Sequence, residues 1–324
     1  MMMMIDVPSR IWLCSIVALL FLTNCKESKK KAPAQPGKAV VETDTFSTPL
    51  GKVYQLSAPS PKLLAAYVKA KKTYEANPKD LDALIWYGRR TAYLGRYADA
   101  IDIYSKGIET FPNEPRLYRH RGHRFISIRQ FDKAIVDLEK AGQLIAGTEN
   151  KIEQDGMPNA QNIPVSTLHG NIWYHLGLAY YLVHDYEKAY TAYLNCRASG
   201  ELPDNIVSST HWLYMIQRRL GNLDMANEML EPISDEMKVI ENQSYYELCK
   251  LYKGMIPKDS LIQTTGSPSN DAVAYGLANW YFYNNKEEEA KKLMEQLVES
   301  PSWSSFGYIA AESDLIHYFQ KADQ

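Results

Sequence analysis

One short segment of this sequence concentrates basic side chains. Residues 116–124, RLYRHRGHR, contain four arginines and two histidines. A guanidinium group can form two parallel hydrogen bonds with a carboxylate or a phosphate group. His120 and His123 are three residues apart and could bind a metal ion from one helix face, but the neighbouring arginines repel a cation and no third ligand is evident. The segment therefore predicts an anion-binding surface and no metal site.

The sequence contains none of the common signatures of catalysis. HExxH, Walker, Rossmann, GxSxG and CxxC patterns are all missing. The formal net charge is −2 and the pI is about 6.4, so the chain has no general attraction to nucleic acid. We therefore expect a binding protein that is not an enzyme, needs no cofactor and does not bind nucleic acid.

The N-terminal residues have the pattern of an export signal. Residues 11–22, IWLCSIVALLFL, would span about 18 Å as a helix, well short of the ~30 Å hydrocarbon core of a membrane. The sequence LTNC at 22–25 resembles a bacterial lipobox. The resemblance implies a signal peptide at 1–24, a lipid on Cys25, and attachment to the bacterial cell envelope, with Lys26 favouring the outer membrane. An uncleaved anchor or a soluble exported protein are the alternatives.

The residues that follow Cys25 are expected to form a linker. The stretch 26–60 contains six lysines and several prolines and has almost no periodic pattern of apolar residues. A flexible coil of this length has a root-mean-square reach of roughly 30–35 Å. Residues 25–60 are therefore predicted to be a flexible linker, and residues 61–324 to be the folded domain.

A period of 34 residues organises the folded part. Gly88 and Gly122 are separated by this distance, as are Ala100 and Ala134. Such a period is typical of stacked helix–turn–helix units. The best-matching unit contains large residues, Leu-Gly and small residues in a fixed order: Trp173, Leu176, Gly177, Tyr180, Tyr186, Ala189, Tyr193 and Cys196.

This pattern resembles the tetratricopeptide repeat (TPR) family. The resemblance implies an all-α, right-handed superhelix of about five helix–turn–helix units in residues 61–324, with residues 63–76 as a cap. Stretches such as NIWYHLGLAYYL also resemble bacterial TPR lipoproteins, and that narrower resemblance implies no particular activity. The segment at about 146–167 interrupts the period. Its Gly, Asn and Pro residues predict a loop.

In TPR proteins the first helix of each unit lines an inner groove. The resemblance therefore implies a partner-binding surface made of basic and aromatic side chains. Residues 61–140 carry a net charge of +6, whereas residues 141–324 carry a net charge of −11. We expect it to bind a protein or peptide partner of acidic character. The predicted residues are Arg89, Tyr93, Arg116, Arg119, His123, Tyr174, Tyr181, His211 and Arg219.

Two alternatives remain open at this point. The arginines could instead pair with acidic residues of the array, or with Glu149, Glu153 and Asp155 of the inserted loop. The groove and the loop could also enclose a small anionic ligand instead of a protein segment.

Overall fold

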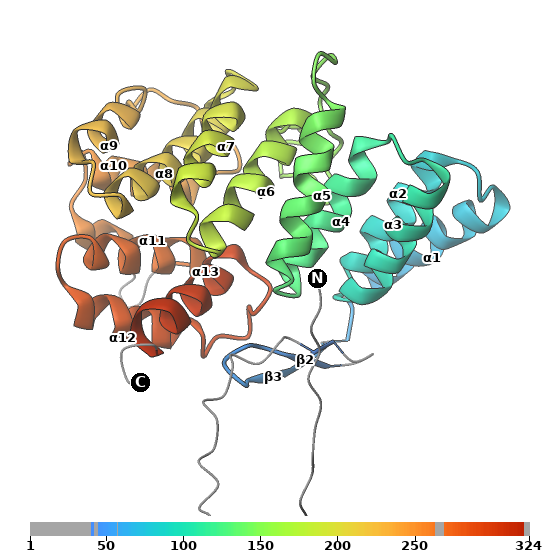
Figure 1. Cartoon of the computed structure of the whole chain (residues 1–324), viewed down its shortest axis with the longest axis horizontal. Coiled ribbons are helices and arrows are strands. Elements are labelled where there is room, and N and C mark those ends of the chain that lie inside the picture. The colour runs from blue at the N-terminus through green and yellow to red at the C-terminus, as the bar shows by residue number, and fades with distance from the viewer. Residues whose placement is uncertain (1–39, 42–44, 57, 263–268, 321–324) are drawn as a thin grey trace, which may run out of the picture. The chain divides into compact units, whose positions relative to one another are not determined.

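The fold is seen in a computed structural model, which describes residues 40–41, 45–56, 58–262 and 269–320 (Figure 1). These residues belong to one unit, Pro36–Gln324. The predicted signal peptide and Cys25 lie outside the described residues. None of the described helices is both long enough and apolar enough to cross a membrane.

Helices dominate the described part of the chain, as the sequence pattern predicts. Side chains that cap several of them accept a hydrogen bond from a backbone N–H of the first turn; Asp80, Thr167 and Asn270 are examples. The helices are α1 Pro61–Ala76, α2 Leu81–Ala92, α3 Tyr97–Thr110, α4 Pro115–Ser127, α5 Phe131–Leu144, α6 Leu168–Leu182, α7 Tyr186–Ala198, α8 Pro203–Arg219, α9 Leu223–Met229, α10 Gln243–Tyr252, α11 Asp271–Phe282, α12 Glu287–Leu297 and α13 Phe306–Asp314, with a 3-10 turn at Lys258–Leu261 and a π-helix at Leu315–Gln320.

Consecutive helices pair into hairpins that stack on one another. The pairs in the described residues are α2–α3, α4–α5, α6–α7, α8–α9 and α11–α12, and each also contacts its neighbours in the chain. Fully buried aromatic side chains pack between them: Tyr193 and Trp212 lie in the main core, and Tyr104 lies in a smaller core formed by α2, α3 and α4. The prediction of an all-α stack of about five helical hairpins is confirmed, and α1 lies at its N-terminal end (Figure 1).

The C-terminal helices return to the middle of the array. The Arg129 guanidinium, in the turn between α4 and α5, donates to Glu312 in α13 at 2.8 Å. The Ser313 hydroxyl donates to the carbonyl of Leu182, at the end of α6, at 2.7 Å. As Figure 1 shows, α13 therefore lies beside the middle hairpins although about 130 residues separate them in the chain.

Part of the predicted linker is folded. Strands β1 (Val40–Val41), β2 (Thr45–Ser47) and β3 (Val53–Gln55) form a small antiparallel sheet. Phe46 is 1% exposed and stacks on Trp303 with ring centroids 4.3 Å apart. The Tyr54 hydroxyl donates to the carbonyl of Val298 at 3.1 Å. The boundary of the flexible linker at residue 60 is therefore wrong: burial of these aromatic rings attaches residues 45–56 to the domain.

Candidate functional site

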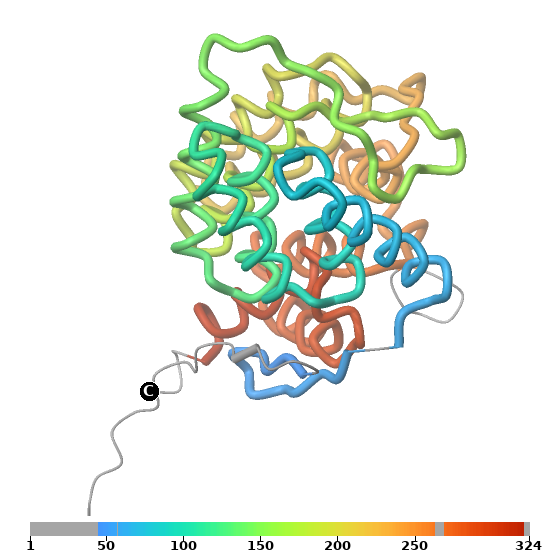
Figure 2. Tube along the Cα trace, turned by 90° about the vertical axis from the view of Figure 1, so that its right-hand side faces the viewer, coloured from blue at the N-terminus to red at the C-terminus, as the bar shows by residue number. Residues whose placement is uncertain are grey.

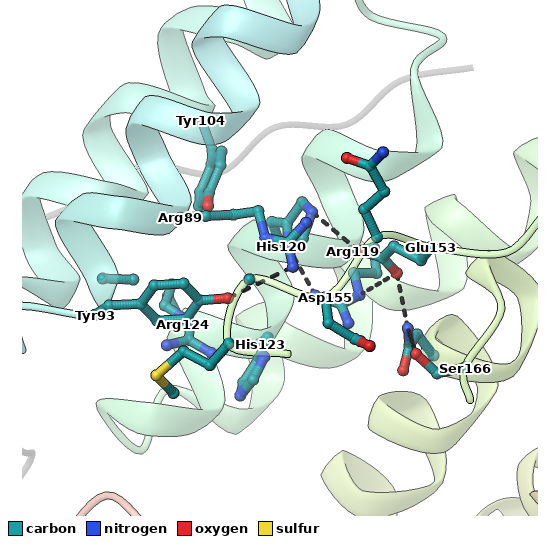
Figure 3. Close-up of a pocket in the computed structure, with 15 residues that line it drawn as sticks. Arg89, Tyr93, Tyr104, Arg119, His120, His123, Arg124, Glu153, Asp155 and Ser166 are labelled. Atoms are coloured by element: carbon teal, nitrogen blue, oxygen red, sulfur yellow. Dashed lines mark hydrogen bonds and ion pairs between the residues drawn. The ribbon is translucent and has the colours of Figure 1, made fainter. Parts of the chain in front are cut away.

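Two adjoining cavities lie where α2 and α4 meet the chain between α5 and α6. Their volumes are about 250 Å³ and about 490 Å³. Arg89, His120 and Glu153 line both cavities. Figure 3 shows the smaller cavity, with the basic side chains of the two helices on one side and the acidic side chains of the loop on the other.

The predicted inserted loop is observed between Leu144 and Leu168, and Figure 2 shows it as a long green stretch without helical turns. Its two ends are joined by backbone hydrogen bonds. Glu153 N–H donates to the carbonyl of Ser166 at 3.1 Å, and Leu168 N–H donates to that of Lys151 at 2.9 Å. This pairing directs residues 152–157 toward α2 and α4.

Glu153 occupies the most basic part of the surface. Its carboxylate lies 3.4 Å from Arg119 Nε and 3.2 Å from His120 Nε2, and it accepts a hydrogen bond from Asn171 Nδ2 at 2.8 Å. Arg119 Nη1 lies 2.8 Å from His120 Nδ1. Because a guanidinium can only donate, this Nδ1 accepts and Nε2 carries the proton that faces Glu153. The loop thus supplies the anion that the sequence predicts for this surface.

Three neighbouring histidines are neutral at neutral pH. Burial, followed by the positive charge of nearby arginines, lowers the pKa of His120, His123 and His175 well below its usual value. The His123 and His175 rings lie 4.2 Å apart. Among the described residues, no group of three or more His, Cys, Asp or Glu side chains could hold a metal ion.

The tip of the loop closes over α2. Arg90 Nη1 donates to the carbonyl of Gly156 at 2.7 Å, and a Cβ at Gly156 would lie only 1.9 Å from the Tyr93 hydroxyl. Arg89 lies over the Trp86 ring, with its guanidinium carbon 4.4 Å from the centroid, and Arg89 Nη2 donates to the Tyr93 hydroxyl at 3.5 Å. A glycine at position 156 therefore allows the loop to approach the Tyr93 ring this closely.

Arg116 and Tyr174 already have partners in the array. Arg116 Nη1 lies 2.6 Å from an Asp82 carboxylate oxygen, and Arg116 Nε lies 2.8 Å from Glu114. The Tyr174 hydroxyl lies 3.0 Å from that of Tyr245 and accepts a hydrogen bond from Trp212 Nε1 at 3.1 Å. Pairing within the array and pairing with the loop therefore both occur.

Three predicted partner-binding residues belong to the interior instead. Tyr181 and His211 are each 1% exposed, and the Arg219 side chain is 2% exposed. Arg219 Nη2 donates to Asp314 at 2.5 Å and Arg219 Nε donates to Asn279 at 2.7 Å. The placement of these residues on the groove surface is wrong, because α10 packs over His211, and α11 and α13 pack over Tyr181 and Arg219.

Sequence reasoning missed three residues of the site. Arg90 and Gly156 join the loop to α2, and no sequence signal other than the interruption of the period points to them. Arg124 lines the smaller cavity and lies over Tyr97, with its guanidinium carbon 5.2 Å from the ring centroid. Its membership of the basic segment 116–124 was the available signal.

The helical hairpins share one internal geometry. A Cβ on Gly88, Gly122 or Gly177 would lie 2.4, 2.7 or 2.6 Å from the side chain found 16 residues later, which is Tyr104, Leu138 or Tyr193 respectively. In the turn of each hairpin one residue has a positive φ: Gly95, Arg129, His184, Gly221 and Asn285. The crossing of a small residue with a large one in these three hairpins, together with the common turn, decides the architecture. The chain has the fold of TPR proteins.

Comparisons with known proteins gave similar solved structures only. No family model matches the chain, and no curated protein sequence matches it significantly. A TPR protein from Parabacteroides merdae superposes with a TM-score of 0.48 and 14% identity, covering 76% of this chain and 92% of that one. YrrB, described as a TPR protein with an unusual peptide-binding site, superposes with a TM-score of 0.42 and 15% identity, covering 76% of this chain and 97% of that one. The TPR protein TTC0263 of Thermus thermophilus superposes with a TM-score of 0.41 and 16% identity, covering 59% of this chain and 90% of that one. Identities this low indicate nothing about function.

Proposed function

We propose that this TPR protein is an adaptor that binds an extended acidic segment of a partner protein, on the surface formed by α2, α4 and the start of α6. One observation supports the proposal. An extended acidic stretch of the chain itself, residues 152–157, already lies on this surface with Glu153 between Arg119 and His120. The protein is proposed to act by binding and not by catalysis.

The charges of the surface favour an exchange of the loop for a partner. Arg89, Arg119 and Arg124 come from the helices, whereas both carboxylates in the smaller cavity, Glu153 and Asp155, come from the loop. Removing the loop would leave these guanidinium groups without a carboxylate in that cavity, which is unfavourable where they are poorly solvated. A carboxylate of a partner could replace Glu153 at little cost, because one charge-assisted contact is exchanged for another.

The loop itself supplies the test peptide. We expect the synthetic peptide ENKIEQDGMP, which corresponds to residues 149–158, to bind the Glu153→Gln variant about tenfold more tightly than the unchanged protein. The substitution keeps the shape of the side chain and removes its charge, so the loop competes less well for Arg119 and His120. Binding is measured by fluorescence anisotropy of the labelled peptide.

Glu149→Gln provides the matched control. This substitution removes the same charge from the same loop, but the Glu149 side chain is 81% exposed. It should leave the affinity close to that of the unchanged protein. A peptide with both Glu153 and Asp155 amidated should bind neither protein. The proposed adaptor function is wrong if the acidic peptide binds none of the proteins. It is also wrong if the acidic and the amidated peptide bind every protein with the same affinity.

Membrane attachment through a lipid on Cys25 is part of the same proposal and is supported by the N-terminal sequence alone. In bacterial cells fed an alkyne-labelled palmitate, the unchanged protein should carry the label and sediment with membranes. The Cys25→Ala variant should lose the label. A variant that still sediments with membranes would contradict the lipid anchor and favour an uncleaved apolar segment.

A further inference from the structure

The smaller cavity lies beneath the loop. Its walls are α2, α4 and loop residues 153–157, and its volume is about 250 Å³. This lies below the ~300–1,000 Å³ that is typical of sites for drug-sized ligands. With the loop in place, the cavity has room for a small molecule and not for a protein segment.

Positive charge in this cavity exceeds negative charge. Arg89, Arg119 and Arg124 line it, against the carboxyl groups of Glu153 and Asp155 (Figure 3). Glu153 is already engaged by Arg119, His120 and Asn171. In the part of the chain that the structure describes, Arg124 has an aromatic contact with Tyr97 and no carboxylate partner within ion-pair distance.

A buried donor in the cavity also lacks an acceptor. Arg119 is 9% exposed, and its Nε forms no hydrogen bond although Glu153 Oε2 lies 3.4 Å away. Glu153 Oε1, which lies 3.2 Å from His120 Nε2, also forms none. An unsatisfied buried donor of a charged group is costly, which an anionic acceptor in the cavity would relieve. Two pKa shifts agree with this geometry: burial lowers the pKa of Arg124, and burial raises the pKa of Asp155, with Glu153 adding to the rise and Arg89 opposing it.

We propose that this cavity binds a small organic anion beneath the closed loop, through one carboxylate or phosphate group held by Arg89, Arg119 and Arg124. Fork-shaped guanidinium groups match the planar or tetrahedral arrangement of such oxygens. Tyr93, Tyr104 and Met157 supply apolar surface for the remainder of the ligand. This site and the bound partner segment exclude each other, since the site is formed only while the loop is closed and the partner segment would take the place of the loop.

Isothermal titration calorimetry of the full-length protein in detergent tests the site with two probes, inorganic phosphate and succinate. We expect saturable binding of at least one probe with a stoichiometry near one. The affinity should fall about tenfold or more in Arg124→Gln, because a hydrogen-bonded charge is lost. Arg96→Gln removes the same charge from the turn after α2, where Arg96 pairs with Asp99, and should leave the affinity unchanged.

The outcomes distinguish a phosphate ligand from a carboxylate ligand, and both from a failure of the proposal. Binding of phosphate alone assigns a phosphate-bearing ligand, and binding of succinate alone assigns a carboxylate. Since Arg124→Gln could fail to fold, Arg89→Gln serves as the second variant. The absence of saturable binding for both probes overturns the proposal, as does an equal loss of affinity in Arg96→Gln, which would indicate unspecific charge attraction.

Discussion

Acidification from pH 7 to pH 5 is expected to remove most of the folding free energy of this protein. Four imidazoles must stay neutral in the folded state: His120, His175 and His211 are 4%, 5% and 1% exposed, and the ring of His123 packs against that of His175. Burial lowers the pKa of each, to about 3 for His211. Arg119 lowers the pKa of the other three further.

The sign of the effect follows from proton counts. Below the ordinary histidine pKa of ~6.5, the unfolded chain binds one more proton per imidazole than the folded protein does, so the free energy of unfolding falls as the pH falls. Each histidine contributes at most about 1.4 kcal/mol per pH unit, and four of them together about 7 kcal/mol between pH 6.5 and pH 5. A typical domain has only ~5–15 kcal/mol in total. The stability is fully present above pH 6.5.

The surroundings of His120 oppose its protonation on balance. Glu153 faces its Nε2 at 3.2 Å and would favour the charged form. However, Arg119 lies against its Nδ1 at 2.8 Å, and Arg89 and Arg124 also lower its pKa. Burial and three guanidinium groups therefore outweigh one carboxylate.

Urea unfolding at pH 7.5, 6.5, 5.5 and 5.0 measures the effect. The His211→Gln variant should reduce the dependence on pH by about a quarter, because one of the four proton-uptake sites is lost. His169→Gln, at the less buried start of α6, should change it much less. A free energy of unfolding that changes by less than about 1 kcal/mol between pH 6.5 and pH 5 would contradict the neutral buried histidines.

Replacement of Asp314 by alanine is expected to cost about 3–5 kcal/mol of stability. Asp314 is 1% exposed and accepts hydrogen bonds from Arg219 Nη2 at 2.5 Å and from the Tyr275 hydroxyl at 2.9 Å. His184 Nε2 lies 3.2 Å from its other oxygen. Without the carboxylate, the guanidinium of Arg219 remains buried and unpaired between α8, α11 and α13.

A double variant distinguishes the lost pair from the unpaired charge. Arg219→Met combined with Asp314→Leu removes both charges and should recover much of the lost stability in urea unfolding. Asp259→Ala is the control, because it breaks the ion pair between Asp259 and Lys258. The Asp259 side chain is 86% exposed, so the expected loss of stability is no more than about 1 kcal/mol. Equal losses for the single and the double variant would show that packing, and not the buried charge, is responsible.

The helical hairpins could be predicted from the sequence because their packing is local. Gly177 and Tyr193 are 16 residues apart and meet wherever two adjacent helices cross at this spacing, so the residue types alone indicate the unit. The loop at about 146–167 was predictable for a similar reason, since its glycines and prolines disfavour helix. The observed loop lies between Leu144 and Leu168.

The surface that remains available was decided by contacts between distant parts of the chain. Tyr181, His211 and Arg219 have the correct position within their repeats for a groove, yet α10, α11 and α13 bury them. Phe46 lies in a stretch without periodic pattern and is nevertheless buried against Trp303.

The sequence by itself therefore determined the repeated hairpins, their small and large contact residues, and the basic character of α4. Only the tertiary structure decided that Glu153 of the loop meets Arg119 and that Asp314 meets Arg219. Helix pairing depends on residues a fixed, short distance apart, which a period reveals. Pairing between a charge and its distant partner depends on where the whole chain returns, and no local spacing records that.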